Sequence, residues 1–137
     1  MEQRVVGQTK SVGFQVGVRR TLPVSQERAW ELVTSAQGLQ LWLGEATDIS
    51  LRPGQRYETK TGESGEIRIV KPLQQLRLTW QKPDWQRAST VQVRILPKAG
   101  GKTTISFHQE HLVDKHVREE MKARWEAVLE EMGKRVI

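Results

Sequence analysis

The sequence predicts a single α+β domain in which a curved antiparallel β-sheet wraps around one long C-terminal helix, with two short helices after the first strand. Three observations support this fold class. Short runs of alternating apolar and polar residues, separated by turn residues, extend from residue 45 to residue 109. One strand-like and two helix-like segments precede them, and a long amphipathic helical pattern follows. A sheet with one apolar face and an amphipathic helix bury each other's apolar surfaces, so we expect two layers.

The N-terminal segment predicts a tail followed by a strand. Residues 1–10 are polar apart from a short apolar pair, so we expect a tail or a fraying strand there, and a single domain over residues 11–137. Residues 11–22 alternate as a strand does, and three apolar side chains fall on one face. These are Phe14, Val16 and Val18. Pro23 ends the strand because proline cannot continue a β-ladder.

Two short helices are expected next. Ser25 is a suitable N-cap for a helix over residues 26–35, and we expect Gly38 to end that helix. A second apolar helical segment then follows and ends at Gly44. It contains Leu39, Leu41, Trp42 and Leu43.

The central part of the chain predicts an antiparallel meander of five or six strands. Turn residues such as Pro53-Gly54, the segment 62–65 and Lys71-Pro72 separate the runs. The apolar residues between these turns define one buried sheet face. They are Ile67 and Ile69, then Leu76, Leu78 and Trp80, then Val91, Val93 and Ile95, then Ile105 and Phe107.

The last segment gives the clearest helix pattern. Apolar residues recur at spacings of three and four, which places them on one face of a helix over residues 114–136. They are Val117, Met121, Trp125, Val128 and Met132. Asp114 is a suitable N-cap for this helix.

Composition restricts the chemistry and the compartment. The chain has no cysteine, which excludes disulfides and thiolate chemistry and favours a reducing compartment. The N-terminal residues are neither a signal peptide nor long and apolar enough for a membrane span. We therefore expect a cytoplasmic protein with no membrane span.

The net charge of +6 raises the question of an acidic partner. The positive excess lies in the strand-rich part, where Arg68, Arg77 and Arg94 alternate out of phase with the apolar residues and so share the solvent face. That face lacks aromatic side chains for base stacking, which argues against nucleic acid as a partner. Such a row more commonly forms a solvated face with contacts to Glu66.

Several short motifs, taken in order, resemble one known family. They are Arg19-Arg20-Thr21-Leu22-Pro23 with Ala29-Trp30, then Leu41-Trp42-Leu43, Pro53-Gly54-Gln55-Arg56-Tyr57, Gly65-Glu66-Ile67 leading to Lys71-Pro72, the strand from Leu76 to Trp80, Gly101-Lys102-Thr103-Thr104-Ile105, and Trp125. Together they resemble homologues of the activator of heat-shock protein 90 ATPase, within the START/SRPBCC (Bet v 1-like) superfamily. The resemblance implies the helix-grip fold. One departure is Arg124, which precedes Trp125 where that family often has glycine, and this implies a groove of different fine shape.

A groove between the sheet and the C-terminal helix is the predicted ligand site, because large flat side chains suit an apolar ligand. The chain has five tryptophans but only two phenylalanines and one tyrosine. The predicted ligand-binding residues are Trp42, Tyr57, Ile67, Leu78, Trp80, Trp85, Val93, Phe107, Met121 and Trp125. Trp85 differs from the rest because it lies in a polar loop, where it can cover the groove or face a partner. The alternative is that these side chains simply fill the core.

No catalytic residue, metal site or cofactor is predicted. His108, His111 and His116 lack the spacing and the carboxylate partners of a metal site. No serine has the context of a nucleophile, and the surroundings of Tyr57 are too generic to define an acid or base.

We therefore expect a non-enzymatic module that binds a small hydrophobic or amphipathic ligand. The alternative is a co-chaperone-like protein-interaction domain that acts on a heat-shock protein 90 type ATPase, with a role in the stress response. A cyclase-like enzyme is the third reading, because the resemblance implies that some superfamily members are enzymes.

Overall fold

The computed structural model describes residues 8–9, 13–46 and 49–136. It consists of a seven-stranded antiparallel sheet and three helices. Along the chain the elements are β1 (Gln8–Thr9), β2 (Gly13–Leu22), α1 (Gln26–Thr34), α2 (Ala36–Trp42), β3 (Arg56–Glu58), β4 (Ser64–Lys71), β5 (Gln75–Trp80), β6 (Ser89–Lys98), β7 (Lys102–Leu112) and α3 (Lys115–Lys134). The expected helix-grip fold is confirmed.

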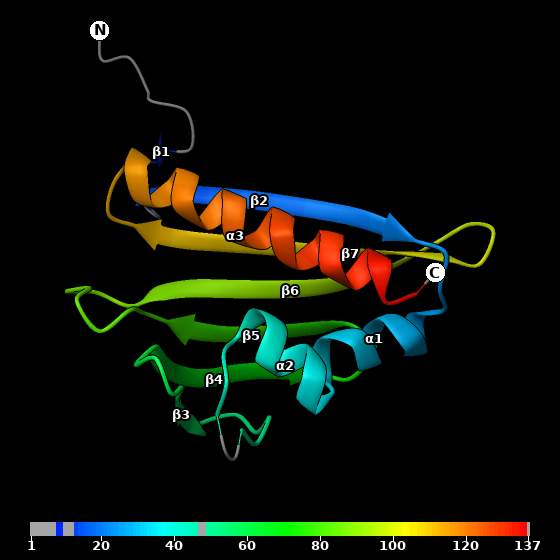
Figure 1. Ribbon diagram of the computed structural model, residues 1–137, viewed down its shortest axis with the longest axis horizontal. Helices are drawn as coiled ribbons and strands as arrows, with labels where there is room; N and C mark the ends of the chain where they lie inside the picture. Colours follow the sequence, from blue (N-terminus) through cyan, green and yellow to red (C-terminus); the bar gives the residue numbers. More distant parts are fainter. Residues whose placement is uncertain (1–7, 10–12, 47–48, 137) are drawn as a thin grey trace, which may run out of the picture.

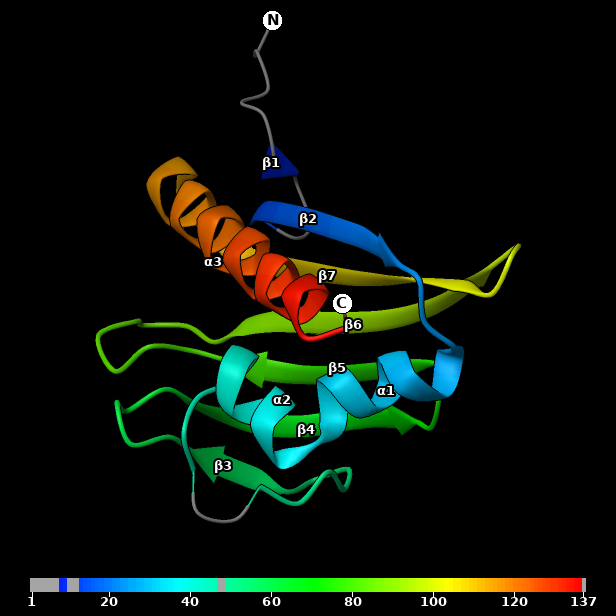
Figure 2. The same ribbon diagram turned by 45° about the vertical axis from the view of Figure 1, so that its right-hand side comes forward.

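All three helices cover the same face of the sheet (Figure 1). The strand order is β1-β2-β7-β6-β5-β4-β3, so β2 joins the sheet next to the last strand of the meander. Helix α3 crosses β2 and β7, whereas α1 and α2 lie over the other half of the sheet (Figures 1 and 2). Side chains from both halves meet between these helices and the sheet.

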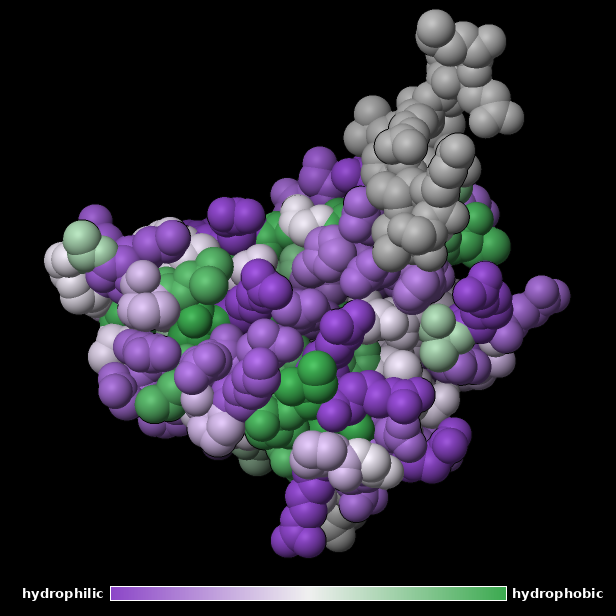
Figure 3. All heavy atoms as spheres, turned by 180° about the vertical axis from the view of Figure 1, so that it is seen from behind, coloured by the Kyte–Doolittle hydropathy of each residue, from purple (hydrophilic) through white to green (hydrophobic). Residues whose placement is uncertain are grey.

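The outer face of the sheet is mostly hydrophilic, with apolar side chains in smaller areas (Figure 3). Two of the three arginines predicted there have carboxylate neighbours. Arg68 pairs with Glu66 at 3.0 Å, and Arg77 lies 3.9 Å from Glu110. Much of the positive charge on this face is therefore balanced locally.

The helix caps agree with the sequence, except at Gly38. The side chain of Ser25 accepts a hydrogen bond from the amide of Arg28, and Asp114 Oδ1 accepts one from the amide of Val117. The expectation that Gly38 ends the first helix is wrong. Ser35 ends α1 and caps α2, and Gly38 lies inside α2.

Close packing of the two short helices explains that glycine. A Cβ at Gly38 would stand 2.0 Å from the carbonyl oxygen of Leu32 in α1. Trp42, the last residue of α2, also ties the two helices together, because its Nε1 donates to the carbonyl of Val33 in α1 at 2.8 Å. Only glycine allows the backbones to approach this closely.

A β-bulge corrects one prediction for the meander. Ile67 pairs with Leu78 but Ile69 pairs with Arg77, so an extra residue lies between them in β4. The extra residue reverses the alternation of side chains. Val70 rather than Ile69 therefore packs against the core.

Within the described ranges, no helix combines the length and apolar character that crossing a bilayer requires.

The contact between α1 and α2 predicts a large effect of Gly38→Ala. The added methyl group would push the helices apart, and we expect the free energy of unfolding to fall by about 3 kcal/mol, at the upper end of the range for overpacking. Urea unfolding followed by circular dichroism measures this change. Gly17→Ala is the matched control, because its Cβ would meet only His108 Cδ2, at 3.7 Å. A loss of stability as large for Gly17→Ala as for Gly38→Ala would contradict this explanation.

Candidate functional site

Nine of the ten predicted ligand-binding residues meet in the interior between the helices and the sheet, and none of them is more than 6% exposed. They are Trp42, Tyr57, Ile67, Leu78, Trp80, Val93, Phe107, Met121 and Trp125. In this conformation the side chains fill the space under α3 themselves. Their contact with a ligand stays a prediction, and it requires that part of this interior opens.

Aromatic rings form the centre of the interior. Phe107 and Trp125 are stacked, with centroids 5.0 Å apart and planes inclined by 10°. Trp42 meets the edge of this pair, 5.6 Å from Phe107. The Trp125 Nε1 donates to Gln109 Oε1 at 2.9 Å, so the indole is fixed by a buried hydrogen bond as well as by stacking.

Trp85 is the tenth predicted residue, and it lies at the rim. It is partly buried and packs against the core. Its ring meets that of Trp80 in a T-shaped contact, with centroids 5.3 Å apart. The contact is direct, so Trp85 is the link between the surface and the buried aromatic residues.

On its other side Trp85 borders a surface hollow of about 730 Å³, a volume in the usual range for small-molecule sites. We call this the Trp85 hollow. It is lined by Gly13, Phe14, Asp84, Trp85, Gln86, Arg87, His111, Leu112, Val113 and Val117. These residues come from the start of β2, the loop between β5 and β6, the end of β7 and the start of α3.

A bulge at the end of β7 shapes the wall of the hollow. The register between β2 and β7 shifts after Phe14, and His111 has a φ of 64°, an unusual value for a residue with a side chain. The strand ends at Leu112, and the next residue, Val113, is 77% exposed. An apolar rim is thereby placed beside Trp85.

Behind Trp80 lies a charged residue that was not predicted as part of the site. Arg124 extends from α3, and its Nη2 donates to the backbone carbonyl of Trp42 at 2.9 Å. Its guanidinium carbon lies 4.9 Å from the ring centroid of Trp80 and 5.4 Å from that of Trp125. The sequence singled out Arg124 only as a departure from the family pattern.

Polar groups on the β3–β4 hairpin face this arginine. The Tyr57 hydroxyl donates to the carbonyl of Thr79 at 2.5 Å. Glu63 accepts hydrogen bonds from the hydroxyls of Thr59 and Thr61. We refer to Arg124, Trp80, Tyr57 and Glu63 as the Arg124 cluster.

The cluster shifts the pKa values of its three ionisable members. Burial raises the pKa of Tyr57 far above its ordinary value. Burial lowers the pKa of Arg124, although Glu63, Glu120 and Tyr57 partly offset the effect. For Glu63 burial acts to raise the pKa, but the two threonine hydroxyls, its own backbone amide and Arg124 together lower it.

Two donors in this cluster have no acceptor. Among the described residues, neither Trp80 Nε1 nor Arg124 Nε has a hydrogen-bond partner, and both atoms are buried. A buried donor without a partner costs about 1–3 kcal/mol. Two such donors on adjoining side chains are therefore an unusual feature of this interior.

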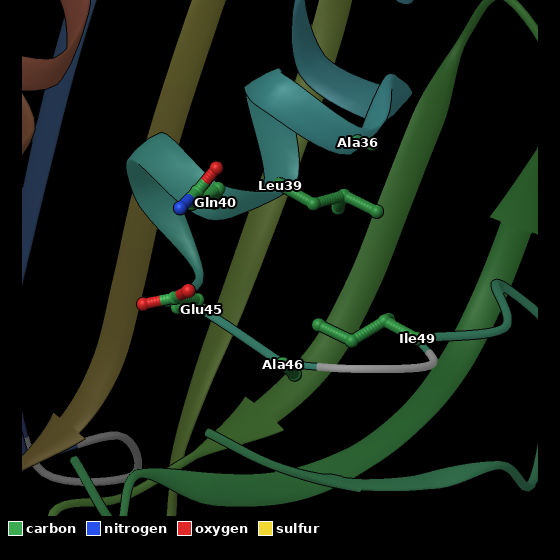
Figure 4. A pocket seen from close by; sticks show the side chains of 7 residues that line it. Ala36, Leu39, Gln40, Glu45, Ala46 and Ile49 are labelled. Atoms are coloured by element: carbon green, nitrogen blue, oxygen red, sulfur yellow. The ribbon is translucent and has the colours of Figure 1, made fainter. Parts of the chain in front are cut away.

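A second hollow lies apart from the predicted residues. It has a volume of about 350 Å³, and the side chains of Leu39 and Ile49 point toward one another across it (Figure 4). None of the ten predicted residues lines it. The three histidines form no metal-binding group within the described part of the chain, and His108 instead shares a 3.0 Å hydrogen bond with Gln15.

Comparison with known proteins places this geometry in context. The family model for the Activator of Hsp90 ATPase homolog 1-like protein matches residues 23–136. Comparison with the curated proteins gave no match.

Solved structures resemble the chain over most of its length. CalU16 from Micromonospora echinospora is 20% identical, with a TM-score of 0.77 over 93% of this chain and 80% of that one. Protein MLL2253 from Mesorhizobium loti is 22% identical, with a TM-score of 0.74 over 88% and 94%. PFC0360w from Plasmodium falciparum, described as an HSP90 activator, is 21% identical, with a TM-score of 0.68 over 81% and 86%. At these identities the likeness shows a shared fold.

The buried hydroxyl of Tyr57 predicts a pH dependence of stability. Its pKa is raised in the folded state, so the native protein holds this proton more tightly than the unfolded chain does. The stabilisation is complete below the unfolded pKa of about 10 and is lost as the pH rises above it. Because Tyr57 is the only tyrosine, absorbance at the tyrosinate band reports it alone. We expect no tyrosinate signal before the near-ultraviolet circular dichroism of the fold disappears; ionisation near pH 10 in the folded protein would contradict this.

Proposed function

Because this chain belongs to the Activator of Hsp90 ATPase homolog 1-like family, whose helix-grip fold suits ligand binding, we propose that it is a binding module for a small amphipathic molecule. The observation that carries the proposal is the position of Trp85 between the hollow and the interior. Its ring borders a space of about 730 Å³ and touches Trp80, which is 0% exposed. A ligand in the hollow would therefore contact Trp85, which in turn touches the buried Trp80.

The proposal explains why an aromatic side chain occupies a polar loop. The loop is held by a turn in which the amide of Trp85 donates to the carbonyl of Lys82 at 3.0 Å, and by a bridge between Ser64 and Gln81. The side chain of Lys82 also pairs with Glu120 of α3. These contacts keep Trp85 against the aromatic interior, where displacement of one side chain would extend the hollow inward. Paired rings of this kind contribute about 0.5–1.5 kcal/mol, an amount that ligand binding can replace.

An apolar probe tests this function. A long-chain alcohol with a terminal bromine should bind saturably and quench tryptophan fluorescence, since bromine quenches indole on contact. Trp85→Ala should weaken this binding about tenfold, because an aromatic wall of the hollow is lost. Trp30→Ala is the control, since Trp30 lies on α1 and does not line the hollow.

Native mass spectrometry of the protein purified from its own host gives a second test. A retained small molecule would support the proposal. A bare mass together with no saturable quenching would refute it.

A co-chaperone-like interaction is the second candidate, favoured by the family match and by the fold shared with the HSP90 activator of Plasmodium falciparum. The surface available for it is the basic outer face of the sheet. Reversing the charges of Arg68, Arg77 and Arg94 to glutamate should then weaken binding to a heat-shock protein 90 type ATPase at least about tenfold at low salt. A pulldown that is insensitive both to salt and to these substitutions would count against this function.

A further inference from the structure

We propose that the Arg124 cluster binds the carboxylate of an amphipathic acid, with Arg124 Nε and Trp80 Nε1 as its donors and the apolar chain of the acid extending past Trp85 toward the hollow. This inference rests on the proposed function and specifies the chemical class of the ligand.

Trp80 supplies the first line of evidence. The residue is 0% exposed, yet its Nε1 has no acceptor among the described residues. The buried indoles of Trp42 and Trp125 both donate, at 2.8 and 2.9 Å. The other two buried indoles therefore each have an acceptor. Among the described residues, Trp80 is the buried tryptophan whose Nε1 has none.

Arg124 supplies the second line. Its Nη2 donates to the carbonyl of Trp42, and its guanidinium carbon lies over the Trp80 ring, so these two contacts hold the side chain in place before any ligand arrives. Its Nε is buried and lacks an acceptor in the described part of the chain. A preorganised guanidinium with a remaining donor is well suited to an anionic oxygen.

The neighbouring carboxylates do not occupy that donor. Glu120 forms its ion pair with Lys82, and Glu63 is held by Thr59 and Thr61. Both carboxylates act on Arg124 at longer range, without an ion pair to it among the described residues. The positive charge is thus partly buried and only partly compensated, which favours an added anion.

The groups around the two donors decide which ligand class fits. Both orphan atoms are donors, so the complementary group is an acceptor, and the adjacent positive charge favours a charged acceptor over a neutral one. The rings of Trp80 and Trp125 lie 4.9 and 5.4 Å from the guanidinium carbon, and Trp85 contacts Trp80, which suits an apolar chain rather than a small hydrophilic anion. An acid with an apolar chain satisfies both requirements.

Matched probes test the inference directly. A long-chain fatty acid with a terminal bromine is compared with the alcohol of the same chain length, with affinity measured by tryptophan quenching. We expect the full chain to bind the acid at least about tenfold more tightly than the alcohol, the difference expected for a charge-assisted hydrogen bond. Trp80→Phe and Arg124→Met should each remove most of this preference.

Arg118→Met is the matched control. Arg118 is also a partly buried arginine of α3, but it donates to the carbonyl of Gln15 and pairs with Glu119, away from the cluster. This variant should keep the preference for the acid. Circular dichroism and the thermal midpoint verify that each variant is folded, and Trp80→Phe serves where Arg124→Met does not fold.

The outcomes separate the two proposals. Equal affinity for acid and alcohol in the full chain, or a preference that survives both cluster substitutions, would overturn the carboxylate site and leave the binding function standing. Failure of both probes to bind would refute the binding function and the carboxylate site together.

Discussion

Burial of one apolar sheet face beneath helix α3 is the interaction on which the rest of this structure depends. The stacked pair of Phe107 and Trp125 joins strand and helix at its centre, and fully burying a side chain of this size contributes about 1.5–3 kcal/mol. Trp125 Nε1 donates to Gln109, whose amide donates to Ser89, and the Ser89 hydroxyl donates to the carbonyl of Trp80, so this chain of polar groups is satisfied inside the layer. The layer fixes α3, and α3 in turn carries Arg124 over Trp80.

An arginine at position 124 of α3 costs desolvation energy and also changes how the helices are held together. Removing a guanidinium from water is unfavourable, and the lowered pKa of Arg124 reflects this. The carbonyl of Trp42 and the face of Trp80 compensate part of the loss, and they tie α3 to α2 and to β5. The same residue therefore packs between the helices and leaves its Nε without an acceptor among the described residues. A domain that only needed a stable core would be served as well by an apolar side chain at this position.

Local sequence patterns were enough to predict the fold, but they predicted only part of the candidate site. The spacing of Met121, Trp125 and Met132 indicates a buried helix face, and all three are buried in α3. Trp85 stands out in sequence because no periodicity accounts for it, and the structure places it at the rim of the hollow. Arg124 gave no such signal beyond its departure from a family pattern, since on a helix of many charged residues one more arginine is not distinctive.

The sequence by itself determined the two-layer architecture, because the spacing of apolar residues and the positions of turn residues are local properties of each helix and strand. It also determined most of the side chains that form the interior. Tertiary structure alone decided that these side chains fill the groove, that the bulge in β4 turns Ile69 outward, and that Gly38 permits a helix contact instead of ending a helix. Each of these outcomes depends on distances between different helices and strands, and periodicity along one segment contains no information about such distances.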